Sequence, residues 1–262
     1  MTVPGLLAST GLLFRAHVRR VWWSRRALAC LVLAAAPPSL AWLITVSNPK
    51  LTGAAIATTF GWLLLLQVVV PLIALIAGSA VITEEIEDRT ISYLFSRPIP
   101  RAAVLLGRWS AALVFVSALL SGSAVLTVAF ASRSSVPGPP LDGGILAPLL
   151  GAAVLGGAVY TALFASAGVF FRHPMIVGLG YAFAIEGFLA NLPGRNQALT
   201  VQHYLRSLVV SRGSPPWLEV ETVDASIFQP SDAPIVVLLV VIAAVLALAS
   251  WRISRREFVL SA

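Results

Sequence analysis

TEEIEDRTISYLFSRPIPRAAVLLGR, residues 83–108, is the stretch that decides how the rest of the chain is arranged. It is the most densely charged run in a sequence with only 11% charged residues, and it separates two long apolar segments. Acidic residues gather in its first turns, where a helix dipole favours anions: Glu84, Glu85, Glu87 and Asp88. Arg97 falls near the end, where the dipole favours cations, and Pro98 then stops the helix. The pattern predicts a short helix on the water side of a membrane.

This short helix carries a small apolar face. Ile91, Leu94 and Phe95 lie at positions i, i+3 and i+4, so their side chains meet on one side. The face is too small to form a core. The residues alone leave two interpretations open, a solvated loop between two membrane spans and a docking helix for a soluble partner.

The order of residues in this stretch resembles the signature loop of the type-2 ABC-transporter permeases. The resemblance implies that the segment is a cytoplasmic coupling helix seated in a groove of a separate ATPase subunit, which would bind ATP and Mg. The residues expected to couple to that ATPase are Glu84, Glu85, Glu87, Asp88, Arg89, Thr90, Ile91, Leu94, Phe95, Pro98 and Arg101. Arg89, where many members have Gly, and Phe95, where Leu is common, depart from the pattern. A looser similarity to the fifth-helix exit of the same family covers residues 185–205.

Composition places the chain in the class of multi-span membrane proteins. Hydrophobic residues make up 58% of the 262 residues, and the mean hydropathy is +0.90. The net charge of +7 comes from arginines that sit between apolar runs, not on one folded face with aromatic neighbours, so no nucleic-acid partner is expected. The single cysteine, Cys30, allows neither a disulfide nor a thiolate metal site within one chain.

The apolar runs predict an all-α integral membrane protein that forms a single domain over residues 1–262. An amphipathic, arginine-rich elbow helix is expected at about 6–26, in the plane of the membrane interface. Six spans follow, at about 28–46, 58–82, 109–131, 145–171, 175–190 and 234–251. The coupling segment 83–108 lies between the second and third spans, and an extracytoplasmic loop covers 191–232.

Two further patterns concern packing. Small residues recur every four positions in the fourth span, namely Ala153, Gly157, Thr161 and Ala165, and they predict close approach of another helix, within the subunit or across a dimer seam. In the outer loop, apolar residues at helical spacing predict a short amphipathic helix that lies on the outer surface or caps a pore; they are Val201, Tyr204, Leu205 and Leu208.

The fifth span contains the only ionisable group expected inside the membrane, Glu186. Its apolar residues favour insertion by roughly 2 to 4 kcal/mol, and a deep carboxylate costs up to about 3 kcal/mol, so this segment should depend on neighbouring helices and be short or partly re-entrant. Glu186 is a candidate for the translocation path or its gate, and a structural carboxyl near the outer interface is the alternative. Gln67 in the second span is a second candidate, and Pro71 is a weaker one for lining a cavity.

Basic residues set the expected orientation. Most of the 18 lysines and arginines fall on one side if the amino terminus is inside, so both termini are expected in the cytoplasm and the protein in the inner (plasma) membrane. A cleaved signal peptide is not expected, because the arginines come late and the first apolar run continues to Val46.

The sequence carries no chemistry for ATP hydrolysis. It has no glycine-rich loop ending in Gly-Lys-Ser/Thr, its sole lysine is Lys50, and no His-Glu-x-x-His zinc motif occurs. The chain is therefore not expected to be an enzyme or to hold a cofactor or metal. The favoured function is the permease subunit of an ABC exporter, with an ATPase subunit, a second identical or related permease and membrane lipid as partners. A secondary transporter and a membrane scaffold that moves nothing are the alternatives.

Overall fold

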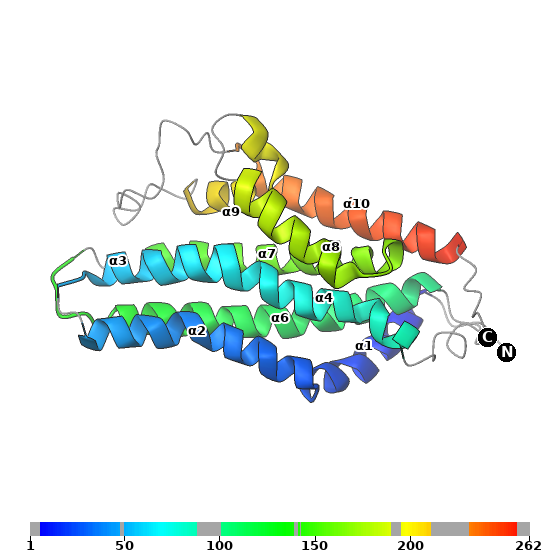
Figure 1. The fold of residues 1–262 in the computed structure, drawn as a ribbon, viewed down its shortest axis with the longest axis horizontal. Helices are drawn as coiled ribbons and strands as arrows, with labels where there is room; N and C mark the ends of the chain where they lie inside the picture. Colours follow the sequence, from blue (N-terminus) through cyan, green and yellow to red (C-terminus); the bar gives the residue numbers. More distant parts are fainter. Residues whose placement is uncertain are drawn as a thin grey trace.

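The computed structural model describes residues 6–47, 50–87, 101–138, 141, 143–189, 195–210 and 231–255. Every regular element in these ranges is a helix, as the sequence predicts (Figure 1). The long helices run along the longest axis of the molecule in layers. α2 packs on α6, α4 packs on α7, and α8, α9 and α10 cover α7 on the other side.

The first half of the chain contributes α1 (Leu6–Trp22), α2 (Arg25–Ser47), α3 (Gly53–Ala57), the π-helix η1 (Thr58–Val69), α4 (Val70–Glu87) and α6 (Arg101–Ala131). The second half contributes α7 (Gly143–Phe170), α8 (Pro174–Gly180), the π-helix η2 (Tyr181–Leu189), the 3-10 helix η3 (Arg195–Leu199), α9 (Val201–Val210) and α10 (Pro234–Arg255). Because α3, η1 and α4 follow one another without a break, the second predicted span becomes one long rod.

Among the residues that the structure describes, five helices are long and apolar enough to cross a membrane, whereas the sequence predicts six spans. They cover Arg25–Ser47, Gly53–Val81, Ala102–Ala131, Ile145–Phe170 and Pro234–Arg255. The predicted fifth span is a shorter apolar helix, Pro174–Leu189, made of α8 and η2. Even at the α-helical rise of about 1.5 Å per residue it would reach at most roughly 24 Å, less than the roughly 30 Å of a hydrocarbon layer. This agrees with the expectation of a short or re-entrant segment.

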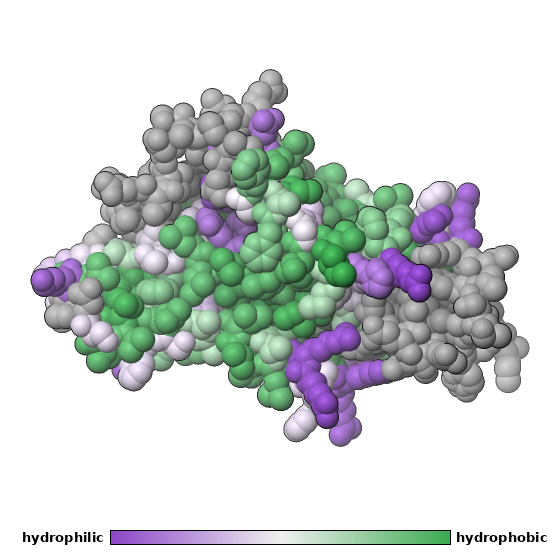
Figure 2. Space-filling view, viewed as in Figure 1, coloured by the Kyte–Doolittle hydropathy of each residue, from purple (hydrophilic) through white to green (hydrophobic). Residues whose placement is uncertain are grey.

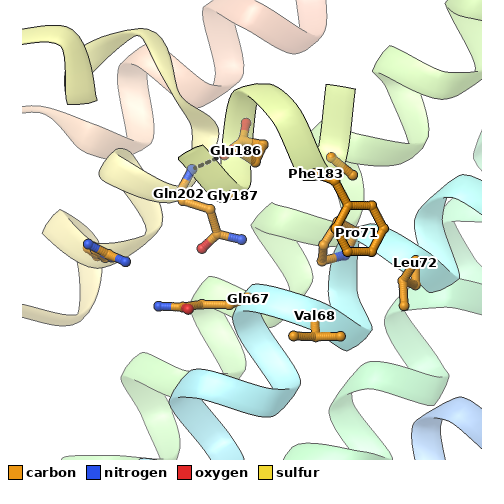
Figure 3. A pocket seen from close by; sticks show the side chains of 10 residues that line it. Gln67, Val68, Pro71, Leu72, Phe183, Glu186, Gly187 and Gln202 are labelled. Carbon is orange, nitrogen blue, oxygen red and sulfur yellow. Dashed lines mark hydrogen bonds between the residues drawn. The ribbon is translucent and has the colours of Figure 1, made fainter. Parts of the chain in front are cut away.

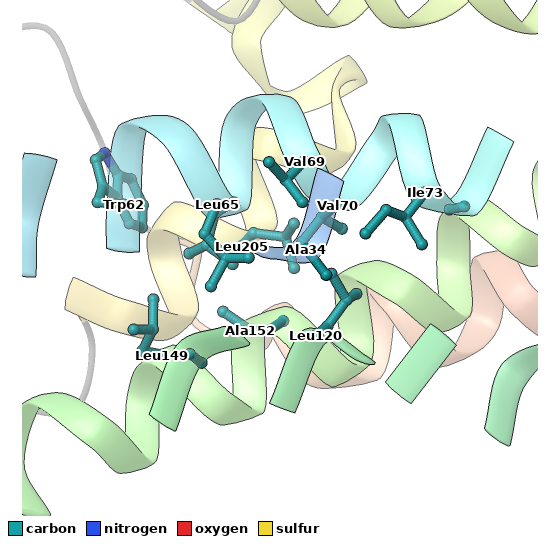
Figure 4. Packing of buried hydrophobic residues seen from close by; sticks show 14 of the residues in the cluster. Ala34, Trp62, Leu65, Val69, Val70, Ile73, Leu120, Leu149, Ala152 and Leu205 are labelled. Carbon is teal, nitrogen blue, oxygen red and sulfur yellow. The ribbon is translucent and has the colours of Figure 1, made fainter. Parts of the chain in front are cut away.

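Small residues bring α4, α6 and α7 close together. A Cβ on Gly78 of α4 would lie 3.0 Å from the carbonyl oxygen of Thr161 on α7, and a Cβ on Gly157 of α7 would lie 3.0 Å from Leu120 of α6. Side chains from these helices and α9 then fill one apolar core (Figure 4). The predicted small-residue stripe is thus used for packing within the chain.

α1 is the predicted amino-terminal helix, and it packs against α6. A Cβ on Gly107 would lie 2.8 Å from the carbonyl oxygen of Thr10, so this glycine admits the α1 backbone. Trp22 adds an edge-to-face contact with Phe115 of α6, with ring centroids 5.2 Å apart. The placement of α1 in a membrane interface stays a prediction.

Candidate functional site

The two residues predicted to line a translocation path, Gln67 and Glu186, lie on one cavity (Figure 3). Its volume is about 150 Å³, and it lies between the η1–α4 rod on one side and η2 with α9 on the other. Its walls are mostly apolar, from Val68, Pro71, Leu72, Ala182 and Phe183. Its polar groups come from Gln67, Glu186, Gln202 and Arg206. The cavity therefore combines an apolar wall with a small polar group of side chains.

Glu186 is almost completely buried, with 4% of its surface exposed, and its carboxylate accepts three hydrogen bonds. The Tyr181 hydroxyl donates to Oε1 at 2.8 Å, and the backbone N–H of Val201 donates to the same oxygen at 2.9 Å. The backbone N–H of Gln202 donates to Oε2 at 3.0 Å. Such bonds stabilise a buried carboxylate without a direct salt bridge, because each donor replaces a water.

The two backbone donors belong to the first turn of α9. The first N–H groups of a helix have no partner within it, and its positive dipole end attracts anions. Thr200 precedes α9, and its Oγ1 accepts the N–H of His203 at 3.2 Å, as a capping residue does. Glu186, which belongs to η2, therefore caps the start of α9. Its bond to Val201 joins η2 to α9 across 15 positions of the sequence.

Gln202 connects α9 to the rod on the opposite side of the cavity. Its Nε2 donates to the carbonyl oxygen of Leu66 at 3.0 Å. That carbonyl has no donor within the rod for a local reason. The N–H of Val70 donates to the carbonyl oxygen of Leu65 instead, and the next residue, Pro71, has no N–H to donate. Pro71 thus leaves an acceptor on the rod, and the Gln202 amide fills it.

Two buried oxygens beside this network, Gln202 Oε1 and the Tyr160 hydroxyl, have no partner with full hydrogen-bond geometry within the described residues, although Tyr160 lies close to the side chains of Glu186 and Gln202. Tyr160 is fully buried on α7 and stacks on Phe164. Buried polar atoms are usually paired, so these two mark a place suited to a water or to a polar group of a bound molecule.

Burial shifts the pKa of two basic residues of α9, Arg206 and His203. Burial lowers the pKa of Arg206, and the Glu186 carboxylate acts in the opposite direction. Burial also lowers the pKa of His203, and the nearby Arg206 adds to this effect. His203 is therefore held more in its neutral form than an exposed histidine is.

Sequence reasoning found Glu186 and Gln67 and missed their partners. The short helix predicted from Val201, Tyr204, Leu205 and Leu208 is present as α9 and packs against the bundle; its place on the outer surface or over a pore stays a prediction. Leu205 packs over Gly156 of α7, and the polar face is buried too, including Gln202, His203 and Ser207. The spacing of Gln202 and Arg206, one helical turn apart, is the signal that could have indicated a second polar side facing Glu186.

The predicted coupling residues fall mostly outside the described residues. Asp88, Arg89, Thr90, Ile91, Leu94, Phe95 and Pro98 lie there, whereas Glu84, Glu85 and Glu87 belong to the last turns of α4 and Arg101 begins α6. The two helices that flank the segment are tied together by buried Arg108, whose Nη1 donates to the carbonyl oxygen of Val81 at 3.2 Å. A displacement of the α4 end is thereby linked to α6.

Within the described part of the chain, no three His, Cys, Asp or Glu side chains are grouped so as to hold a metal ion. The absence of a cofactor from this chain stays a prediction.

The family model described as ABC-2 family transporter protein matches residues 19–258. No curated protein matches the chain. The family match spans both the predicted coupling segment and the cavity residues.

Proposed function

The chain belongs to the ABC-2 family of transporter proteins, and from this premise we propose that it is the permease subunit of an ABC exporter. Subunits of this family cross the membrane and are not themselves the ATPase. ATP hydrolysis in a separate ATPase subunit would supply the energy, at the segment between α4 and α6. The observation that carries this proposal is the family match over residues 19–258, supported by the five long apolar helices among the described residues.

The cavity at Gln67 and Glu186 is proposed to be one part of the translocation path. Its volume of about 150 Å³ is well below the roughly 300 to 1,000 Å³ of sites that enclose a drug-sized ligand. A single chain in this conformation therefore holds only a small group. A complete path requires either movement of η2 and α9 away from the rod or a wall from a second permease subunit, identical or related.

Glu186 is proposed to hold α9 in place until that movement occurs. It holds the first turn of α9 through two backbone bonds, and Gln202 holds the same turn to the rod at Leu66. Force on the end of α4 would travel along the continuous rod to Leu66 and Gln67, which face these bonds. Breaking the hydrogen bonds from α9 to Glu186 and from Gln202 to Leu66 would then open the cavity, and their return would close it.

The partner ATPase is tested by co-purification. Leu94→Asp with Phe95→Asp should abolish capture of the co-expressed ATPase by the tagged permease, because charge replaces the apolar face predicted to dock. Phe95→Leu is the matched control and should retain the ATPase. Membrane extracts should contain each variant in equal amount. Undiminished capture with the double Asp variant would overturn the proposed docking helix.

The driving force is tested in vesicles that contain the permease with its ATPase. In these vesicles, transport should stop when ATP is removed and continue when a protonophore is added, and the transported compound should stimulate ATP hydrolysis. A secondary transporter would lose transport with the protonophore and not with removal of ATP. A scaffold would show no transport, and its partner's ATP hydrolysis would not respond to candidate compounds.

A further inference from the structure

A second groove lies at the end of the bundle where α1 and the end of α10 are found, away from the cavity at Glu186. It has a volume of about 470 Å³. Its walls come from α4 and from the first residues of α2 and of α8. Figure 2 shows hydrophilic residues gathered where the apolar surface ends, at this end of the molecule. The groove therefore opens at the border between apolar and polar surface.

Four basic side chains line this groove, and they come from two distant parts of the sequence. Arg25 and Arg26 begin α2, whereas Arg172 and His173 stand just before Pro174, the first residue of α8. No Asp or Glu is among the described residues that line it. Arginine keeps its charge in any such setting, and guanidinium groups match the oxygens of a phosphate in pairs. The charge of these side chains and their donor chemistry favour a phosphate-bearing anion.

The remaining wall of the groove is apolar and faces outward. Met175 and Ile176 are 56% and 70% exposed, and Ile76 of α4 lies across from them. Leu28, one turn along α2, is also exposed. Exposed apolar side chains of this number on a membrane-spanning bundle are expected to contact acyl chains. A free anion would leave this wall unused, whereas a phospholipid would cover it.

We propose that this groove binds an anionic phospholipid, with the phosphate between Arg25 and Arg172 and an acyl chain along Met175 and Ile176. Basic pockets between membrane helices are suited to such headgroups. The bound lipid would join the start of α2 to the start of α8, which leads through η2 to Glu186. This site depends on the chain crossing a membrane and not on the proposed direction or energy source of transport.

The test is lipid binding to the detergent-purified full chain. Dioctanoyl-phosphatidylglycerol is the probe, and binding is followed by native mass spectrometry and by the shift in the thermal unfolding midpoint. The variant Arg25→Gln with Arg172→Gln should weaken binding at least tenfold and remove the thermal shift. Arg252→Gln with Arg255→Gln is the matched control at the end of α10, outside the groove, and should bind as the wild type does.

Two further probes identify the source of the phosphate. Dioctanoyl-phosphatidylcholine and inorganic phosphate should each give less than a tenth of the effect. An equal shift with inorganic phosphate would overturn the lipid assignment in favour of a free anion, and an equal shift with phosphatidylcholine would show that charge is irrelevant. Equal binding by the groove variant and the control would overturn the site itself. If the double variant does not fold, Arg172→Gln alone, at an exposed position, carries the same comparison.

Discussion

The bundle of α4, α6 and α7 differs from the cap formed by η2 and α9 in how much hydrogen bonding adds to apolar packing. In the bundle, glycines such as Gly78 and Gly157 let backbones approach, and apolar side chains fill the space between them (Figure 4). The cap packs Leu205 on Gly156 in the same way, but it adds hydrogen bonds from two backbone N–H groups to a buried carboxylate and from a glutamine amide to the rod. Figure 3 shows the bond between Gln202 and Glu186. Apolar packing tolerates little movement, whereas hydrogen bonds can exchange partners. The difference supports the proposal that the cap is the part that moves.

The largest expected effect breaks the cap at Glu186. Glu186→Leu removes the acceptor of the Tyr181 hydroxyl and of two backbone N–H groups, so buried donors lose their partners at about 1 to 3 kcal/mol each. We expect the thermal unfolding midpoint in detergent to fall by many degrees and substrate-stimulated ATP hydrolysis to be lost. Glu186→Gln, which keeps one carbonyl oxygen, should lose less than half as much. Equal stability of Glu186→Leu and the wild type would contradict the capping role.

The second prediction breaks the bundle instead. Gly78→Leu places a side chain where a Cβ already lies 3.0 Å from the Thr161 carbonyl oxygen, so α4 and α7 must separate. Overpacking of this kind costs about 1 to 3 kcal/mol. The control is Gly122→Leu on α6, where a Cβ meets nothing within 4 Å. Thermal unfolding of the two variants side by side measures the difference, and a smaller loss for Gly78→Leu than for Gly122→Leu would be inconsistent with this packing.

The third prediction sharpens the account of the Gln202 contact with the rod. Gln202→Leu leaves the Leu66 carbonyl without its side-chain donor, at a cost of about 1 to 2 kcal/mol. Pro71→Ala restores a backbone N–H near that carbonyl, so in the double variant the loss from Gln202→Leu should shrink by about half. A double-mutant cycle of thermal stabilities measures this coupling. Strict additivity would mean that Pro71 is not the reason for the contact.

The smallest expected effect concerns pH. The pKa of His203 is lowered by burial, so the unfolded chain takes up a proton more readily than the folded chain. Stability should therefore fall as the pH drops below about 6.5, the ordinary histidine value. Between pH 7 and pH 5 the unfolding midpoint of the wild type should fall by a few degrees more than that of His203→Gln. A parallel fall in both proteins would assign the pH dependence to other groups.

Hydropathy was sufficient to predict the long helices because a membrane-spanning segment must satisfy its own backbone and be apolar along its length. Those rules gave the positions of α2, the rod, α7 and α10 to within about five residues of the apolar spans, but α6 begins at Arg101, well before the predicted start at 109. They were least decisive at the fifth span, where Glu186 and a short apolar run are nearly balanced. The segment is a shorter apolar helix, as expected, and its crossing of the membrane stays a prediction. The π-helical turns of η1 and η2 were not predicted, since apolar composition is the same in α and π helices.

The sequence by itself determined that this chain is a bundle of membrane helices with a charged segment between the second and third spans, because composition and charge act locally. It also singled out Glu186 and Gln67 as polar residues in apolar surroundings. Only the tertiary structure decided that they share one cavity, that Glu186 caps α9 and that Gln202 bonds to Leu66. These contacts join residues 16 and 136 positions apart, and no local pattern encodes which polar groups meet when the helices pack.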